Sequence, residues 1–152
     1  MLKPVLLVTC RAGNEDWCVE EIGNVLFPYD HMIRVEKTRY PGLIIVYSNL
    51  DPLKAYNYAL SHEYGFVKKI IPILYICSFS DEIFEKVDKL VKPGERVKVK
   101  LRIRGRRGYS RIFWRKIMEV LKSKQARHDP SSETCLYIEG IDDIIYIGKG
   151  KC

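Results

Sequence analysis

The sequence has no apolar run long enough to cross a membrane as a helix. Its longest apolar segment, Ile70–Cys77 (IIPILYIC), is far shorter than the roughly 20 residues that a bilayer requires, and it contains Pro72. The amino-terminal segment MLKPVLLVTC has an apolar centre of only a few residues and leads directly to Arg11. This is typical of a first strand and not of a signal peptide. These absences predict a soluble, cytoplasmic protein without a membrane partner.

The sequence also lacks the motifs that usually hold nucleotides or metals. It contains no G-x-x-x-x-G-K-[ST] loop and no G-x-G-x-x-G, and the short Gly148–Gly150 segment (GKG) is a weak match to either. The histidines, His31, His62 and His128, are scattered. No Ser/His/Asp or Cys/His arrangement stands out. We therefore expect no cofactor, no metal and no enzymatic activity.

Cysteine occurs five times but never as a C-x-x-C pair, so neither a zinc site nor a disulfide framework is indicated. We expect most of the cysteines to fill apolar positions in the core. Cys10 and Cys18 could meet where a strand packs on a helix, and the sequence leaves open whether they pair. An intracellular disulfide is typical of hyperthermophiles. A composition rich in Lys, Arg, Glu and Ile, with Gln125 as its one glutamine, is compatible with that origin.

What the chain has in excess is positive charge, and that charge is concentrated in one segment. Residues Arg96–Arg127 contain 13 of the 26 lysines and arginines but a single acid, Glu119, which gives a local balance of 13 − 1 = +12. Because the whole chain is +7, the remainder sums to −5. Ordinary solvated surfaces mix both signs, so this segment predicts an anionic partner. A solvated basic face on a well-soluble protein is the alternative.

The basic segment predicts a strand, a turn and a helix in succession. Apolar and cationic residues alternate over Val97–Arg104, which indicates a strand with one apolar and one cationic face. Gly105–Gly108 (GRRG) is typical of a turn. Ser110 is expected to cap a helix over Arg111–Lys124, whose inward residues would be Phe113, Trp114, Ile117, Val120 and Leu121. Arginines at the start of this helix oppose its dipole, and a bound phosphate would resolve that conflict.

The remaining sequence predicts two modules with the boundary near Cys77. Residues 1–77 follow the order β-α-β-β-α-β of a ferredoxin-like fold and end in a long strand over Val67–Cys77. Residues 78–152 follow the order α-β-α-β-β, with Ser80 capping the first helix. No flexible linker separates the halves. We therefore predict an α+β protein in which the N-terminal ferredoxin-like module packs against a C-terminal α/β module.

Three segments carry a resemblance to a known family: VKVKLRIRGRR with Ser110 opening the helix, HDPSSETCLYIEG, and the closing strand IIYIGKG. Together they resemble the THUMP domain, an RNA-binding module of tRNA-modifying proteins. A ferredoxin-like module followed by such a domain is the arrangement that this family uses, and the resemblance covers nearly the whole chain. It implies a C-terminal THUMP module that binds the acceptor stem and the 3′ CCA end of tRNA.

Most THUMP proteins carry a catalytic domain, and the sequence shows none. Among standalone members, the segment CRAGNEDWCVEEIGNVL is similar to the opening of an adaptor group that helps an RNA acetyltransferase make acetylcytidine in tRNA. The resemblance therefore implies an adaptor that presents tRNA to a separate modifying enzyme, such as an RNA cytidine acetyltransferase.

The residues expected to bind RNA lie in the basic segment and would recognise the shape and the phosphates of the RNA. They are Lys98, Lys100, Arg102, Arg104, Arg106, Arg107, Tyr109, Ser110, Arg111 and Arg115. Two alternatives stay open. The chain could be a protein-interaction module whose basic face docks an acidic partner, or it could be a subunit of a tRNA-modifying enzyme.

Overall fold

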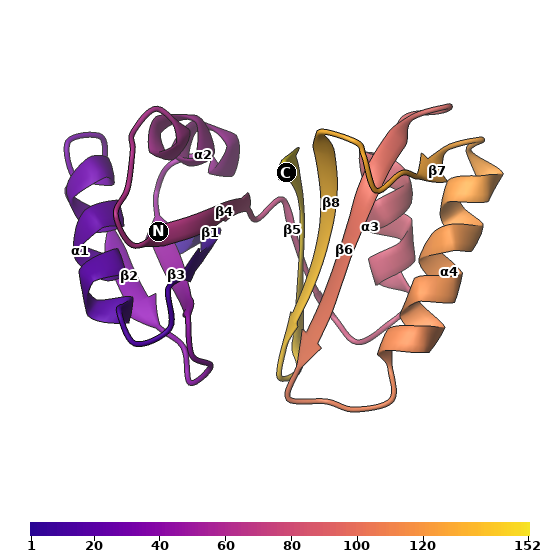
Figure 1. Cartoon of the computed structure of the whole chain (residues 1–152), viewed down its shortest axis with the longest axis horizontal. Coiled ribbons are helices and arrows are strands. Elements are labelled where there is room, and N and C mark those ends of the chain that lie inside the picture. Colours follow the sequence, from indigo (N-terminus) through magenta and orange to yellow (C-terminus); the bar gives the residue numbers. More distant parts are fainter. The chain divides into compact units, whose positions relative to one another are not determined.

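A computed structural model describes all 152 residues, which form two compact units, Met1–Ile73 and Leu74–Cys152. Each unit has its own sheet (Figure 1). Each also has its own apolar core. The fold class is α+β, as the sequence predicts. The division lies after Ile73, whereas the sequence placed the domain boundary after Cys77. No helix is long and apolar enough to span a bilayer.

The first unit has the element order predicted for it. Its elements are β1 (Lys3–Cys10), α1 (Glu15–Leu26), β2 (Arg34–Lys37), β3 (Leu43–Ser48), α2 (Pro52–Leu60) and β4 (Val67–Pro72). The sheet order is β2-β3-β1-β4 with every neighbouring pair antiparallel, which is the ferredoxin-like arrangement. The helices α1 and α2 share one apolar core with β1, β3 and β4.

Local sequence explains how this unit begins and ends its elements. The carboxylate of Asp51 accepts a hydrogen bond from the Leu53 N–H at 3.1 Å, and Pro52 occupies the first position of α2. Both features favour a helix start. In the central strand β1, the run Val5–Val8 is fully buried, which explains its continuous apolar sequence. A disulfide joins Cys10 at the end of β1 to Cys18 in α1, the pairing that the sequence left open.

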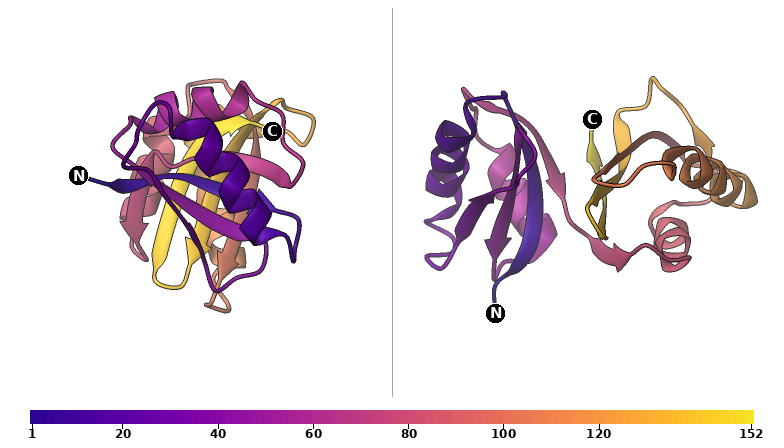
Figure 2. Two further views of the ribbon diagram at one scale, coloured as in Figure 1. Left: turned by 90° about the vertical axis from the view of Figure 1, so that its left-hand side faces the viewer. Right: turned by 90° about the horizontal axis from the view of Figure 1, so that it is seen from below.

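The second unit has a mixed five-stranded sheet. Its elements are β5 (Tyr75–Ser78), α3 (Glu82–Leu90), β6 (Arg96–Arg104), α4 (Ser110–Ser123), β7 (Arg127–His128), β8 (Thr134–Ile141) and β9 (Ile144–Lys151). The sheet order is β5-β9-β8-β6-β7, with β6 parallel to both β7 and β8. Figures 1 and 2 show α3 and α4 on the same side of this sheet.

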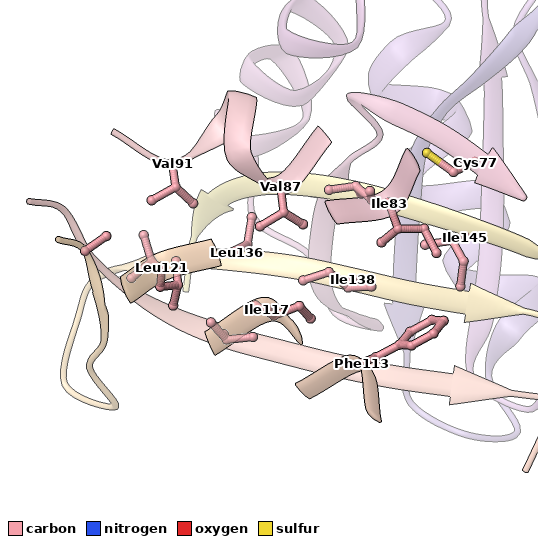
Figure 3. Packing of buried hydrophobic residues seen from close by; sticks show 14 residues of the cluster. Cys77, Ile83, Val87, Val91, Phe113, Ile117, Leu121, Leu136, Ile138 and Ile145 are labelled. Atoms are coloured by element: carbon pink, nitrogen blue, oxygen red, sulfur yellow. The ribbon is translucent and has the colours of Figure 1, made fainter. Parts of the chain in front are cut away.

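The core of the second unit lies between the sheet and these two helices. Ile83 and Val87 of α3 and Ile117 of α4 are fully buried against Leu136 and Ile138 of β8 (Figure 3). Ile83 and Val87 are four residues apart on α3, and Leu136 and Ile138 are two apart on β8, so each pair lies on one face of its element. This packing fixes α4 beside β6, which positions the basic segment.

The prediction of one long strand over Val67–Cys77 is wrong. The chain leaves the first sheet after Pro72 and enters the second sheet at Tyr75. The Ile73 N–H donates to the Val5 carbonyl oxygen and the next N–H, that of Leu74, donates to the Ile147 carbonyl oxygen, both at 2.9 Å. Both halves of the segment are apolar, so the local pattern could not reveal that its backbone pairs in two different sheets.

Most of the cysteines are buried, as expected: Cys10, Cys18, Cys77 and Cys135 are each at most 5% exposed. Nothing in the sequence indicated a second disulfide. Cys135 at the start of β8 forms a disulfide with Cys152, and only Cys77 is a free, buried thiol. The β8–β9 hairpin brings Cys135 opposite Gly150, close to the chain end. That proximity depends on strand register, which cysteine spacing in the sequence does not contain.

Candidate nucleic-acid interface

The strand β6 has the two-faced pattern predicted from its alternation. Val97 and Val99 are buried in the core of the second unit. Lys98 and Lys100 on the opposite face are half-buried, whereas Arg102 is exposed. The cationic side chains of this strand therefore differ in their access to solvent, and the face is not a uniform basic surface.

Arg104, the last residue of β6, is held by a carboxylate. Its Nη1 lies 3.7 Å from Glu139 Oε2 of β8, and the two side chains are only 9% and 8% exposed. A guanidinium this deeply placed needs its counter-charge nearby. Arg104 was among the residues expected to contact RNA, but its position beside Glu139 places it below the surface.

The turn after β6 holds Arg106 in a defined position. Gly105 and Gly108 both have positive φ angles, 87° and 85°, which glycine adopts readily. Arg106 Nε donates to Asp143 Oδ1 at 2.9 Å, and the guanidinium lies 4.4 Å from the ring centroid of Phe79. The hydrogen bond with Asp143 raises the pKa of Arg106. Arg106 thus ties the turn to the β8–β9 hairpin and to the segment before α3.

The helix α4 begins one residue earlier than predicted. Ser110 is its first residue and not its cap; Tyr109 occupies the cap position with helical backbone angles, and no side chain caps the helix. The ring of Tyr109 packs against Phe79 and Phe113, with centroids 5.1 and 5.8 Å away. These contacts hold Tyr109 at the cap position, so Ser110 lies in the first turn of the helix and does not act as the cap.

The aromatic side chains of the basic segment have structural partners. Tyr109, which was expected to contact RNA, is half-buried, and its ring packs against Phe79 and Phe113. Trp114 lies edge-on to His128 with ring centroids 5.0 Å apart. Phe113 is 7% exposed, in agreement with its expected core position.

Three arginines around the start of α4 are both exposed and unpaired. Arg107, Arg111 and Arg115 have no ion pair or hydrogen bond from their side chains within the chain. Arg111 and Arg115 are four residues apart on α4, so they lie on one side of the helix. We refer to Arg107, Arg111 and Arg115 as the exposed arginines. Arg107 precedes α4 and Arg111 is its second residue, so both belong to the helix start, where the first backbone N–H groups have no partner within the helix.

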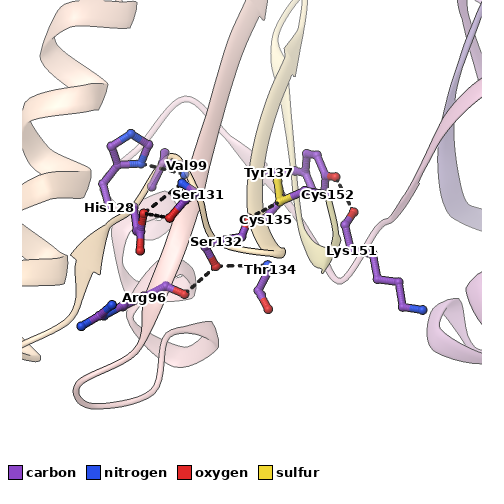
Figure 4. The surroundings of a disulfide bond; sticks show 11 residues. Arg96, Val99, His128, Ser131, Ser132, Thr134, Cys135, Tyr137, Lys151 and Cys152 are labelled. Carbon is purple, nitrogen blue, oxygen red and sulfur yellow. Dashed lines mark hydrogen bonds between the residues drawn. A yellow bond between two sulfur atoms is a disulfide. The ribbon is translucent and has the colours of Figure 1, made fainter.

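The HDPSSETC segment supports β6 from its other end. The Val99 N–H donates to His128 Nδ1 at 3.0 Å (Figure 4). Ser132 Oγ donates to the Arg96 carbonyl oxygen at 3.0 Å and accepts from the Thr134 N–H at 3.1 Å. The segment therefore fixes the first residues of β6 and β8, and its hydrogen bonds do not involve the exposed arginines.

The GKG segment, a weak match to a nucleotide-binding loop, has a structural role. No group of His, Cys, Asp and Glu side chains is arranged to hold a metal ion. Lys149, in the GKG segment, donates to Glu95 Oε1 at 2.7 Å and to the Leu90 carbonyl oxygen at 2.8 Å. This lysine therefore joins β9 to the end of α3 and to the loop that follows it.

Sequence reasoning missed Phe79 and Asp143, the residues that position Arg106. Asp143 lies in the turn between β8 and β9, and Phe79 precedes α3. Neither has a local signal that connects it to Arg106, because the contacts arise between segments distant in the chain.

No protein-family model and no curated protein matches the sequence. Solved structures do match its fold. PH1313 from Pyrococcus horikoshii is 20% identical with a TM-score of 0.71, over 98% of this chain and 55% of that one. TrmN from Thermus thermophilus is 15% identical with a TM-score of 0.66, over 97% of this chain and 45% of that one. A 4-thiouridine synthetase solved as an RNA complex with bound ATP is 15% identical with a TM-score of 0.57, over 99% and 42%.

This likeness shows that the chain has a THUMP-like fold. The match includes both units, since it extends over nearly all of the chain. The chain spans about half the length of the solved proteins that it matches.

Proposed function

We propose that this chain is a THUMP-type protein that binds tRNA through the exposed arginines and presents the acceptor stem and 3′ CCA end to a separate modifying enzyme. In this role the chain performs no catalysis itself, and its partner is an enzyme such as an RNA cytidine acetyltransferase. The observation that carries the proposal is the placement of three exposed, unpaired arginines at a helix start that no side chain caps.

Phosphate is the ligand chemistry that fits this arrangement. Arginine side chains bind phosphate oxygens in a forked geometry, and the free N–H groups of a helix start add donors and a favourable dipole. Arg106 keeps the turn in place through Asp143 and Phe79, so that Arg107 projects from a fixed backbone. Arg102 and Lys98 could extend the contacts along β6, since neither is paired with a carboxylate.

The comparisons support RNA as the polyanion. One solved protein with the same fold is an RNA complex, and another is TrmN. The acceptor stem, the CCA end and the acetyltransferase enter the proposal through the resemblance to THUMP adaptors. An acidic protein as partner of the same arginines is the competing reading.

The test replaces the exposed arginines together. Arg107→Ala/Arg111→Ala/Arg115→Ala should weaken tRNA binding about tenfold or more at moderate salt, because each lost phosphate contact removes counterion release. The slope of log affinity against log salt should fall by about two to three. Filter binding or fluorescence anisotropy with labelled tRNA over a salt series measures both quantities.

A matched control separates local contacts from net charge. Lys54→Ala/Lys68→Ala/Lys89→Ala removes the same charge from three exposed lysines elsewhere and should leave the affinity within about threefold. Equal affinity and an equal salt slope in the arginine variant and the unmodified protein would contradict the proposal. If the unmodified chain does not bind tRNA at moderate salt, the acidic-partner reading takes its place.

A further inference from the structure

A groove runs between the outward sides of α3 and α4, with a volume of about 390 Å³. Its apolar lining comes from Phe84 of α3 and Val120 of α4, both half-buried. The inner side of the Phe84 ring is fixed, because it packs edge-on against Phe113 at 5.6 Å. The groove therefore has a rigid apolar floor, and its size falls within the range of roughly 300–1,000 Å³ typical of binding pockets.

The rim of the groove is acidic. Asp81, Glu85 and Glu119 line it together with a single cation, Lys116, so its local balance is 1 − 3 = −2. Lys116 is already engaged: its Nζ lies 3.4 Å from Asp81 Oδ1 and 5.3 Å from the Phe84 ring centroid. Glu85 and Glu119 are exposed and have no cation partner within the chain. Glu119 is also the one acid of the basic segment Arg96–Arg127.

This rim distinguishes the groove from the exposed arginines on the same helix. With about 100° per residue, Arg111 and Arg115 lie within about 40° of each other around α4. The groove residues Lys116, Glu119 and Val120 are centred roughly 110° away from them. One side of α4 is thus cationic and polar, whereas the other is apolar with an acidic border. Phosphates would be repelled by that border, so the groove is unsuited to RNA.

We propose that the α3–α4 groove docks a segment of a partner protein in which a bulky apolar side chain is flanked by lysines or arginines. The apolar side chain would lie against Phe84 and Val120, and the flanking cations would face Glu85 and Glu119. Charge complementarity of this kind orients a partner and excludes acidic competitors. The inference rests on the adaptor part of the proposed function, and it assigns tRNA and protein to different sides of α4.

The test is a selection from a displayed library of random peptides on the full chain. The library is first depleted on the variant Glu85→Lys/Glu119→Lys, which removes peptides that bind elsewhere. Enriched peptides should carry Leu, Ile, Met or Phe within a few positions of at least two basic residues. Synthetic copies should bind the unmodified chain about tenfold more tightly than this variant, which corresponds to modest contributions from two rim charges.

A second variant tests the floor of the groove. Val120→Ser keeps the rim charges and should also weaken the same peptides, whereas Lys54→Ala should not. Circular dichroism and thermal unfolding establish that each variant is folded. The proposal is overturned if no such peptides emerge, if the enriched peptides are acidic, or if they bind the Glu85→Lys/Glu119→Lys variant equally well.

The outcomes for groove and tRNA are separable. The Glu85→Lys/Glu119→Lys variant should bind tRNA at least as tightly as the unmodified chain, because it loses two negative charges and gains two positive ones. The variant lacking the exposed arginines should bind the selected peptides normally. If the chain binds the selected peptides but not tRNA, the groove proposal stands and the proposed RNA function is wrong. If it binds tRNA but no such peptides, only the groove proposal is wrong.

Discussion

Arg104 and Arg106 lie close together in the chain but each is bound by a carboxylate from the β8–β9 hairpin. Arg104 pairs with Glu139 and Arg106 with Asp143. The first pair is nearly buried, whereas Asp143 is largely exposed. Among the residues predicted to bind RNA, Arg104 and Arg106 therefore have partners within the protein, whereas the exposed arginines have none. The distinction depends on contacts between residues more than 30 positions apart, so the alternating pattern of β6 could not reveal it.

The buried pair predicts a large effect of a small change. Glu139→Gln keeps the size of the side chain but removes the negative charge beside the nearly buried Arg104 guanidinium, so the free energy of unfolding should fall by about 3 kcal/mol. Combining it with Arg104→Met, which removes the positive charge as well, should recover part of that loss. Urea unfolding of the single and double variants measures the coupling. Glu133→Gln, at an exposed position, is the control and should change stability by less than about 0.5 kcal/mol. A Glu139→Gln variant with the same free energy of unfolding as the unmodified protein would contradict the assignment of Glu139 as a stabilising partner of Arg104.

The carboxylate of Asp30 makes the stability of the protein depend on pH in the acidic range. This carboxylate accepts hydrogen bonds from Ser48 Oγ at 2.7 Å and from the Asn49 and Met32 N–H groups at 2.8 and 2.9 Å. These bonds, that of Ser48 first, hold the pKa of Asp30 below its usual value of 3.8. Because the folded pKa is lower than the unfolded one, the stabilisation is present above about pH 4 and is lost as the pH falls through the folded pKa.

Asp30→Asn should therefore be less stable at pH 7, and its stability should fall less steeply below about pH 4 than that of the unmodified protein. Unfolding midpoints in urea between pH 7 and pH 2 give both results. Glu63→Gln, at an exposed and unpaired position, should follow the unmodified curve. Parallel curves for Asp30→Asn and the unmodified protein would show that Asp30 has no such role.

Among the elements, those with a repeating apolar pattern were predictable and those defined by partners were not. The alternation in β6 and the helical spacing of Phe113, Ile117 and Leu121 each gave the buried face correctly. The start of α4 was displaced because Tyr109 is held by aromatic contacts. The break between β4 and β5 was missed because an apolar run contains no information about which strand it will pair with. Likewise, the sequence predicted Arg107, Arg111 and Arg115 as candidate residues. It could not distinguish them from Arg104 and Arg106, which lie beside carboxylates.

Each disulfide connects segments that are close together in the sequence. Cys10–Cys18 joins β1 to α1 over 8 residues, and Cys135–Cys152 joins β8 to the end of β9 over 17. Because a longer loop loses more entropy on closure, Cys135→Ser/Cys152→Ser should lower the free energy of unfolding by about 3 kcal/mol and Cys10→Ser/Cys18→Ser by slightly less. Guanidinium unfolding without reductant measures both changes.

Thiol titration checks the pairing directly. Burial, followed by the charge of Glu82, raises the pKa of Cys77, so this thiol should react slowly in the folded protein. Unfolded protein that has not been reduced should show one reactive thiol per chain, and reduced protein all five cysteines. Three or more thiols before reduction would mean that a disulfide is absent in solution.

At the scale of the whole molecule, a net charge of +7 conceals an uneven distribution. The segment Arg96–Arg127 alone carries +12 and the rest of the chain −5. A long-range attraction to any polyanion follows from this charge, so binding to tRNA by itself is weak support for a specific role. Discrimination between RNA forms is more informative than affinity.

The proposed function predicts such discrimination. The affinity for tRNA that lacks its 3′ CCA nucleotides should be lower than that for intact tRNA by about fivefold or more at the same salt concentration. The contacts made by the unpaired end are then missing, while those to the helical phosphates remain. Competition of the two forms for the full chain measures this ratio. A duplex RNA of matched length serves as control, and equal competition by all three would indicate charge-driven binding without recognition of the end.

The passage from Ile73 to Leu74 also limits how this protein can change in length during evolution. Consecutive backbone N–H groups are committed there to Val5 of one sheet and Ile147 of the other. An inserted or deleted residue would shift β4 or β5 by one position, and such a shift turns every side chain of a strand to the opposite face. Insertions and deletions should therefore accumulate in the surface loops of either unit, whereas the number of residues between β4 and β5 stays fixed even where the residues themselves vary.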